Sequence, residues 1–469
     1  MTATTMTSPG LLTVHSPYDG RNVGQVRIPD GAAVERAIAQ AHACQAELAA
    51  LPAYRRAGAL DTVSRGLTDR AEEVARLITA ENGKPLKWAR AEVTRAASTF
   101  RWAAEEARRW SGQLQRLDTD PGSEGRLALV RRVRRGPVLG IAPFNFPLNL
   151  VAHKMAPALA VGCPIVLKPA PATPLSAELL GELLAQTDLP VGTWSVLPVD
   201  NEVAAQLVHD KRLPVVSFTG SGPVGWGIRD AVPRKHVTLE LGGNAAVVVA
   251  NDFEDLAWAA QRIATFAMAQ AGQSCVSVQR VLCVDERCDE LRQRILEQVQ
   301  SLRTGDPADP MTDVGPLINV AAAERVQSWV QEAVAAGARL LCGGQREGST
   351  LAPTVLEDVP AGSRVLDEEV FGPVVVLQRV ATVEEAFMLV NRSRFGLQAG
   401  LFTRDLSLAF RAARELDVGG VIIGDVPSYR ADQMPYGGVK DSGRGREGLR
   451  SAMYDLTEAK ILVLTGVDL

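Results

Sequence analysis

The chain has 469 residues, 46% of them hydrophobic and 22% charged, which is ordinary for a globular protein of two or three domains. Its net charge of -4 argues against a nucleic-acid partner, because proteins that bind nucleic acids usually carry an excess of basic residues. No basic segment followed by an apolar stretch opens the chain, and the apolar region 150–167 is interrupted by His153, Lys154 and two prolines. We therefore expect neither a signal peptide nor a membrane span.

The six cysteines form no CxxC pair and no Cys/His cluster. This spacing predicts neither a structural zinc site nor a disulfide framework. Free thiols are typical of a reducing compartment, so we expect a cytoplasmic protein without a metal site.

Helical periodicity dominates the first hundred residues. Apolar and charged residues alternate at helical spacing over 31–51, 54–84 and 87–110. The second of these segments contains Asn82-Gly83 near its end, a typical helix C-cap.

The pattern then changes to short apolar runs. Residues 125–144 alternate like a pair of strands, rich in arginine. From Val138, apolar runs alternate with helical segments, and strand-like runs resume at Ala245 and continue to the tail, 459–464. Strand and helix in alternation predict parallel sheets covered by helices. The expected fold class is therefore α/β, with two such domains and a small β element.

A glycine motif follows one of these runs. "SFTGSGPVGWG" contains G-x-G-x-x-G at Gly220, Gly222 and Gly225, with Glu240 twenty positions after the first glycine. In the dinucleotide-binding fingerprint an acid at this spacing holds a ribose hydroxyl. Glu240 also stands between apolar residues, where burial would raise its pKa and make it a base. Alternatively, it ends a strand and faces solvent.

Four further residues carry possible chemistry. Cys275 follows a small, polar approach, "GQS", which suits a nucleophile, although a lone cysteine is more often inert core. Asn145 in "PFNFP" could donate to an oxyanion or simply form a turn. Lys168 ends an apolar run, where it could bind a phosphate or ribose or lie on the surface. Glu369 lies in "EEVFGP", a loop whose acids are usually solvated.

Together these strings, with "LKPA", "FTGS", "LELGG" and "MPYGGVKDSGRGREG", resemble the aldehyde dehydrogenase superfamily over nearly the whole chain. The resemblance implies three parts. They are a modified Rossmann NAD(P)-binding domain from 1–115 and 136–245, an α/β catalytic domain, 246–440, and a β oligomerisation flap with the C-terminal tail from 116–135 and 441–469. It also implies a homodimer or homotetramer.

The resemblance further implies roles for these residues. The Cys275 thiolate would attack an aldehyde, Asn145 would hold the oxyanion, and Glu240 would activate water instead of binding ribose. Lys168 and Glu369 would bind the two riboses. The other implied cofactor contacts are Ile141, Pro143, Phe144, Gly220, Ser221, Val224, Gly225, Leu241 and Phe371.

One residue departs from the family pattern. NAD-preferring members usually carry a glutamate three residues after the lysine, and this chain has Pro171. A 2′-phosphate would not be repelled there, so the cofactor is NAD or NADP, with NADP tolerated.

The expected substrate is a small hydroxy- or anionic aldehyde, as in the lactaldehyde, glyceraldehyde-3-phosphate and phosphonoacetaldehyde branch of the family. The polar residues Asn149 and His153, with Arg101 and Arg430, are the candidate substrate contacts. Ser274 departs from the arginine that the phosphonoacetaldehyde type has before the cysteine.

Other functions stay open. The enzyme could oxidise succinate semialdehyde or a broad range of aliphatic aldehydes. A CoA-acylating enzyme is disfavoured by Glu240, and a non-catalytic structural or binding protein by the complete set of Cys275, Glu240 and Asn145.

Overall fold

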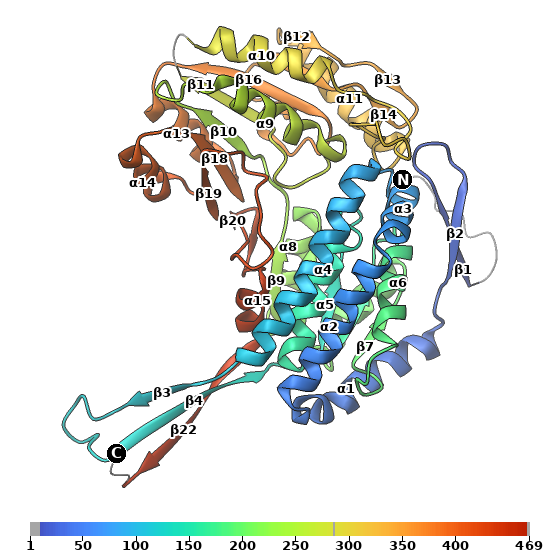
Figure 1. Ribbon diagram of the computed structural model, residues 1–469, viewed down its shortest axis with the longest axis vertical. Helices are drawn as coiled ribbons and strands as arrows, with labels where there is room; N and C mark the ends of the chain where they lie inside the picture. The colour runs from blue at the N-terminus through green and yellow to red at the C-terminus, as the bar shows by residue number, and fades with distance from the viewer. Residues whose placement is uncertain (1–9, 285–286, 467–469) are drawn as a thin grey trace.

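The computed structural model describes residues 10–284 and 287–466. Residues 1–9, part of the segment in which no signal peptide is expected, lie outside this range. Figure 1 shows two sheet-containing units, one above the other, and a long three-stranded sheet that projects from the lower unit. The predicted α/β fold class is confirmed.

Four helices precede the first parallel sheet. They are α1 (Gly31–Ala50), α2 (Ala53–Asp69), α3 (Ala71–Asn82) and α4 (Leu86–Arg109). The segment 54–84, expected as one helix, is divided at Arg70, whose φ of −102° and ψ of 21° are not helical. Gly83 ends α3 in the left-handed region, at φ 76°, so the predicted C-cap is confirmed. The preceding hairpin, β1 (Leu11–His15) with β2 (Asn22–Arg27), was not predicted.

The lower unit is built on a six-stranded sheet in the order β21-β9-β8-β5-β6-β7. Its strands are β5 (Val138–Ile141), β6 (Ile165–Lys168), β7 (Trp194–Val196), β8 (Val215–Thr219), β9 (His236–Glu240) and β21 (Gly443–Arg444). Its helices are α5 (Asn149–Val161), α6 (Leu175–Leu184), α7 (Asn201–His209) and α8 (Gly222–Ala231). All strands but β21 run parallel, so the ends of β5, β6, β8 and β9 share one edge.

The upper unit is built on a seven-stranded sheet in the order β12-β15-β16-β11-β10-β18-β19. Its strands are β10 (Ala246–Val249), β11 (Arg280–Val284), β12 (Arg339–Cys342), β15 (Thr354–Glu357), β16 (Val374–Val380), β18 (Gln398–Phe402) and β19 (Gly420–Ile423). Its main helices are α9 (Leu256–Met268), α10 (Cys288–Gln300), α11 (Val320–Ala335), α13 (Val383–Arg392) and α14 (Leu406–Glu415). Shorter elements are η1 (Ala269–Gly272), β13 (Arg346–Glu347), β14 (Thr350–Leu351), α12 (Arg364–Asp367), β17 (Phe395–Gly396) and β20 (Val439–Lys440).

The projecting sheet, here called the flap, has the order β22-β4-β3. It contains β3 (Gln113–Arg116), β4 (Arg126–Arg134) and β22 (Thr457–Thr465), while α15 (Leu449–Asp455) packs on α4 and α5. The segment 125–144 does form two strands, but they do not pair with each other. β4 pairs with β3 and β22, and β5 joins the six-stranded sheet. Local alternation cannot identify a partner three hundred residues away.

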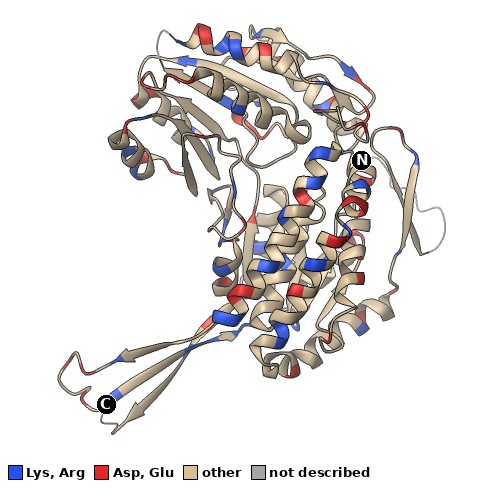
Figure 2. Cartoon of the chain, viewed as in Figure 1, with Lys and Arg blue, Asp and Glu red and all other residues tan. Residues whose placement is uncertain are grey.

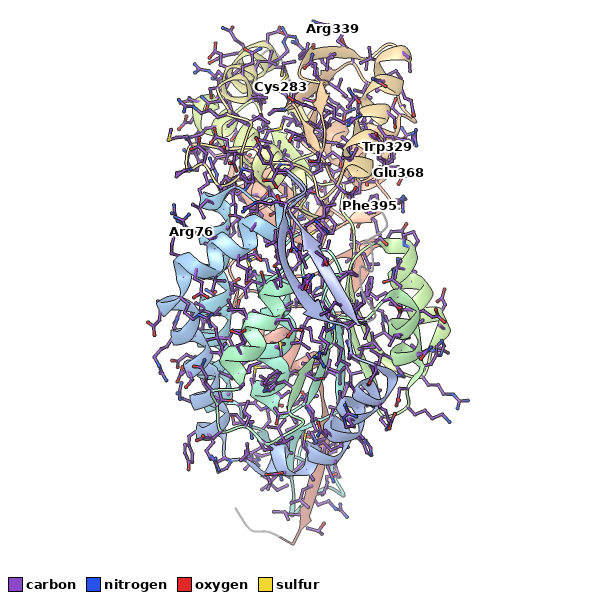
Figure 3. All side chains as sticks on the ribbon, turned by 90° about the vertical axis from the view of Figure 1, so that its right-hand side faces the viewer. Arg76, Cys283, Trp329, Arg339, Glu368 and Phe395 are labelled. Atoms are coloured by element: carbon purple, nitrogen blue, oxygen red, sulfur yellow. A yellow bond between two sulfur atoms is a disulfide. The ribbon has the colours of Figure 1, made fainter. Side chains whose placement is uncertain are left out.

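Two of the six cysteines are bonded. Cys283 lies in β11 and Cys288 begins α10, and a disulfide joins them across a Cα–Cα distance of 5.5 Å. Figure 3 labels Cys283 in the upper unit. The expectation of free thiols is therefore wrong for this pair, because the end of β11 and the start of α10 place the two cysteines within bonding distance. Within the described ranges no helix is both long and apolar enough to cross a membrane.

Charged residues of both signs are interspersed along α2, α3 and α4 (Figure 2). Several form ion pairs on the surface, such as Arg90 with Glu72 and Arg70 with Glu73.

Candidate active site

A cavity of about 460 Å³ lies at the shared edge of β5, β6, β8 and β9 and is also lined by loops of the upper unit. It brings together the five residues whose chemistry was predicted, Asn145, Lys168, Glu240, Cys275 and Glu369. Its lining also includes the predicted contacts Ile141, Pro143, Phe144, Gly220, Ser221, Leu241, Phe371 and Arg430. The strand ends of one unit and the loops of the other thus form one site.

Glycines shape the turn that carries Cys275. Gly272 has φ 68°, and a Cβ added there would lie 2.0 Å from the Gly372 carbonyl oxygen. A Cβ added to Gly243 would lie 2.0 Å from the carbonyl oxygen of Cys275 itself. Both positions therefore require glycine, and the close packing holds the cysteine at the cavity.

The thiol of Cys275 lies 3.1 Å from the hydroxyl oxygen of Tyr436. Burial raises the pKa of this thiol to about 12, while the Tyr436 hydrogen bond and the Arg430 cation oppose the rise. Groups that stabilise negative charge on the sulfur therefore matter for its reactivity.

The side chain of Asn145 reaches the loop before Cys275. Its Nδ2 donates to the Gln273 carbonyl oxygen at 3.0 Å, and the Gln270 side-chain amide donates to the Asn145 carbonyl oxygen. An amide nitrogen has two hydrogens, so the second can serve an oxyanion at Cys275.

Glu240 is the last residue of β9 and is buried. Neither carboxylate oxygen has a hydrogen-bond partner among the described residues. Burial raises the pKa of Glu240 well above its ordinary value, and the Glu447 carboxylate adds to the rise. An unpartnered buried carboxyl with a raised pKa is suited to take a proton from water.

A buried ionic network supports this corner of the site. Lys154 Nζ donates to Thr219 Oγ1 at 2.7 Å and lies 3.4 Å from Glu447 Oε1, while Arg430 Nη2 donates to Glu447 Oε2 at 3.1 Å. Burial alone would raise the pKa of Glu447, but the Lys154 and Arg430 cations lower it to about 2. Glu447 is therefore charged at neutral pH and Glu240 is the group that can change its protonation.

The remaining groups at the cavity fit a dinucleotide. Burial lowers the pKa of Lys168 to about 8, and its Nζ lies 3.5 Å from Asn201 Oδ1, so it can donate to ribose or phosphate oxygens. Glu369 accepts a hydrogen bond from the Gly243 N–H at 2.8 Å, and burial raises its pKa to about 7. Ser221 caps α8 without a side-chain hydrogen bond, so the first N–H groups of that helix are available to phosphate.

Two predicted cofactor contacts lie beside the cavity without lining it. Val224 is 53% exposed on the first turn of α8. Gly225 is buried, and a Cβ there would lie 2.4 Å from Leu241 Cδ2. Gly225 therefore allows α8 to pack closely on the residue that follows β9.

A second cavity, of about 290 Å³, adjoins the first. Ser274, next to Cys275, lines it, and Arg430 lines both cavities. Its other polar lining includes Arg95 from α4 and Arg262 from α9, and its apolar lining includes Trp88, Phe146 and Phe266. This composition suits a short carbon chain with a negative charge.

Arg95 lines this cavity with part of its side chain still exposed. Its Nη2 donates to Asp432 Oδ1 at 3.0 Å, and 31% of its side chain stays accessible. Arg262, in contrast, is paired with Asp425 by two hydrogen bonds of 2.7 and 2.8 Å.

Three of the four predicted substrate contacts do not line either cavity. Arg101 is exposed on α4 and stacks on Trp102. Asn149 is buried and accepts a hydrogen bond from Thr99 at 3.4 Å. His153 Nε2 lies 3.2 Å from Asp432 Oδ1, and burial lowers its pKa to about 4, so this histidine is neutral and holds Asp432 in place. Only Arg430 reaches the site.

Sequence reasoning missed Arg95, Lys154, Tyr436 and Glu447. The last two stand in "MPYGGVKDSGRGREG", which carried the resemblance without a role for them. Lys154 had a signal of its own, a lysine in an apolar helix. Arg95 had no such signal, because it is one of several arginines along α4 and nothing in the sequence distinguishes it from the others. No group of metal-ligating side chains occurs in the described ranges.

Known proteins resemble this chain over most of its length. The model of the aldehyde dehydrogenase family matches residues 5–462. A 3-sulfolactaldehyde dehydrogenase of Priestia megaterium is 43% identical over 412 residues, which cover 88% of this chain and 86% of the relative. Among solved structures, aldehyde dehydrogenase 21 of Physcomitrella patens, in complex with succinate, is 44% identical with a TM-score of 0.96, covering 97% and 95% of the two chains. An NADP-dependent glyceraldehyde-3-phosphate dehydrogenase of Bacillus halodurans, complexed with NADP, is 35% identical with a TM-score of 0.93, covering 98% and 96%.

The chain therefore belongs to the aldehyde dehydrogenase family. The expectation of an NAD(P)-dependent aldehyde dehydrogenase is confirmed at this level.

Proposed function

We propose that this enzyme oxidises a small anionic aldehyde to the carboxylate, with Cys275 as nucleophile and NAD or NADP as cofactor. The observation that carries the proposal is the cavity that adjoins Cys275, because it is lined by Arg95, Arg262 and Arg430. Guanidinium groups bind a carboxylate, sulfonate or phosphate well. The relatives named for 3-sulfolactaldehyde and solved with succinate act on or bind such anions.

The residues present account for each step of the oxidation. The Cys275 thiolate bonds to the aldehyde carbon, and the carbonyl electrons move to the oxygen, which accepts hydrogen bonds from the Asn145 amide and the Cys275 N–H. Bound NAD(P)+ would supply the hydride acceptor, and loss of the hydride from the carbon bonded to Cys275 would leave a thioester. Glu240 then takes a proton from water as the water oxygen attacks the thioester carbon. The Cys275 thiolate leaves and the carboxylate product is released.

Arg95 gives the direct test of substrate charge. We expect Arg95→Gln to lower kcat/KM for succinic semialdehyde about 10- to 100-fold, the range for a lost hydrogen bond to a charged group. Butanal has the same chain length without the carboxylate, so its kcat/KM should hardly change. Both values come from the absorbance of the reduced cofactor. Arg101→Gln is the matched control, since Arg101 lies on the same helix but is exposed. Equal effects of the two substitutions, or an equal loss with butanal, would contradict the proposal.

Pro171 gives the test of cofactor choice. Pro171 and Lys168 line the same cavity, and proline adds no negative charge there. We therefore propose that NADP is accepted, and expect Pro171→Glu to lower kcat/KM for NADP about 100-fold through like-charge repulsion, with little change for NAD. Pro171→Gln introduces a side chain of the same size as glutamate without its charge. The ratio of kcat/KM for NADP to kcat/KM for NAD should then stay near that of the parent enzyme. An unchanged NADP value in Pro171→Glu would show that this position does not face the 2′-phosphate.

The flap supports a homodimer or homotetramer. Its edge strand β22 exposes Ile461, Leu462 and Val463, with exposed fractions of 60%, 55% and 48%. The seven-stranded sheet also ends in an edge strand, β19, which exposes Ile423. Apolar side chains on strand edges favour pairing with another chain. A second copy of this protein is the partner we propose.

We keep the expected division of the chain as a proposal, with a cofactor domain from 1–115 and 136–245 and a catalytic domain from 246–440. It is supported by the separate sheets that these segments form.

We also keep the cytoplasm as the proposed compartment, because a nucleophilic thiol works best in a reducing environment. The disulfide between Cys283 and Cys288 is the observation that counts against this compartment.

A further inference from the structure

Tyr436 contacts the reacting atom of the proposed nucleophile. Its hydroxyl oxygen lies 3.1 Å from Cys275 Sγ, and no other side chain within residues 10–284 and 287–466 hydrogen-bonds this sulfur. The tyrosine is only 4% exposed, and its ring packs with Val276 and Leu397. The hydroxyl is the one polar part of this side chain, and it is directed at the sulfur.

The surrounding contacts hold Tyr436 in this position. The Tyr436 N–H donates to the Glu447 carbonyl oxygen at 3.0 Å, and the Glu447 N–H donates to the Tyr436 carbonyl oxygen at 2.7 Å. The Glu447 carboxylate binds Arg430, whose guanidinium carbon lies 3.8 Å from the centre of the Tyr436 ring. The backbone bridge, the ion pair and the ring stacking therefore link three residues whose side chains are largely buried.

The chemistry of this contact favours the charged sulfur. A thiolate accepts hydrogen bonds more strongly than a thiol, so a fixed hydroxyl donor stabilises the thiolate form. The cation above the ring adds to this effect, since it makes the phenol a stronger donor. Burial raises the pKa of Tyr436 well above its ordinary value, so the phenol keeps its proton and donates without transferring it.

We propose that Tyr436 is a catalytic residue that activates Cys275 by donating a hydrogen bond to its thiolate, held in place by Arg430 and Glu447. The inference rests on the proposed function in taking Cys275 as the nucleophile. It adds a residue to the reaction and can be tested without an aldehyde.

Alkylation of Cys275 by iodoacetamide measures the thiolate directly in the full-length enzyme. Tyr436→Phe keeps the ring and removes the donor. We expect it to slow the alkylation of Cys275 about tenfold at a given pH. The plot of log rate against pH should shift to higher pH by about one unit, as for a lost charge-assisted hydrogen bond. The value of kcat/KM should fall by a similar factor. Peptide mass spectrometry separates Cys275 from Cys342, whose rate should stay constant, and Tyr54→Phe changes a tyrosine that is 71% exposed as a matched control.

A second replacement tests the opposite direction and preserves the fold. 3-Fluorotyrosine at position 436 keeps the hydroxyl and makes it a stronger donor, so Cys275 should be alkylated faster than in the parent enzyme. Alkylation that is unchanged or faster in Tyr436→Phe, or slower with 3-fluorotyrosine, would overturn the inference. If the parent enzyme oxidised no aldehyde, the proposed function would fail while the alkylation comparison would still be decisive. If it oxidised aldehydes and all variants were alkylated alike, only the inference about Tyr436 would fail.

Discussion

Glu240→Gln is expected to slow steady-state turnover strongly after a first, fast round of cofactor reduction. Glutamine fills the same space at the end of β9 but cannot take a proton from water. Attack by Cys275 and hydride loss can still occur, so the thioester should accumulate. Loss of a general base costs about 10²- to 10⁴-fold, and the steady-state rate should fall by this amount. Rapid mixing of enzyme, cofactor and aldehyde, followed by absorbance, would show a burst of about one reduced cofactor per active site.

The pH dependence gives this prediction a second readout. Because burial raises the pKa of Glu240, its carboxylate forms only at a pH well above the ordinary range for glutamate. Hydrolysis of the thioester by the parent enzyme should therefore speed up as the pH rises through this raised pKa, and the slow hydrolysis by Glu240→Gln should not follow that rise. Glu254→Gln removes an exposed carboxylate and serves as the control. A variant that turned over normally, or gave no burst, would refute the role of Glu240 in hydrolysis.

Cys275→Ala should lower the oxidation of every aldehyde at least about 10⁴-fold, because no covalent intermediate can form. Binding of the cofactor should persist, since Lys168 and Glu369 are unchanged. Absorbance of the reduced cofactor measures the first effect, and quenching of protein fluorescence by the cofactor measures the second. Cys342→Ala replaces another free, half-buried cysteine and should keep full activity. Activity in Cys275→Ala, or its loss in Cys342→Ala, would place the nucleophile elsewhere.

Much of the fold could be predicted because many of its strands have a recognisable local sequence pattern. The run at 138–143 is apolar throughout, as a strand buried on both faces should be, and it contains β5. The run at 213–220 is mostly apolar and contains β8. The pairing of β4 was not predictable in this way. Its partner β22 lies more than three hundred residues later, and alternation within 125–144 carries no information about that segment.

The site residues likewise fall into those that local sequence predicts and those that it does not. Asn145, Glu240 and Cys275 stand in short strings whose spacing carried the resemblance, and the cavity brings them together. Arg95 and Arg101 look alike in the sequence, yet only Arg95 lines a cavity, because six residues along a helix change the direction of the side chain. Such a choice depends on how α4 packs, which local sequence does not specify.

The return of the C-terminal segment to the lower unit has a consequence for biosynthesis. β21 adds to a sheet whose other strands end by residue 240, and Arg430, Tyr436 and Glu447 reach the site from the same late part of the chain. A ribosome therefore exposes Cys275 long before it has made the groups that surround the sulfur. The reactive centre can therefore assemble only after residues 430–447 have left the exit tunnel.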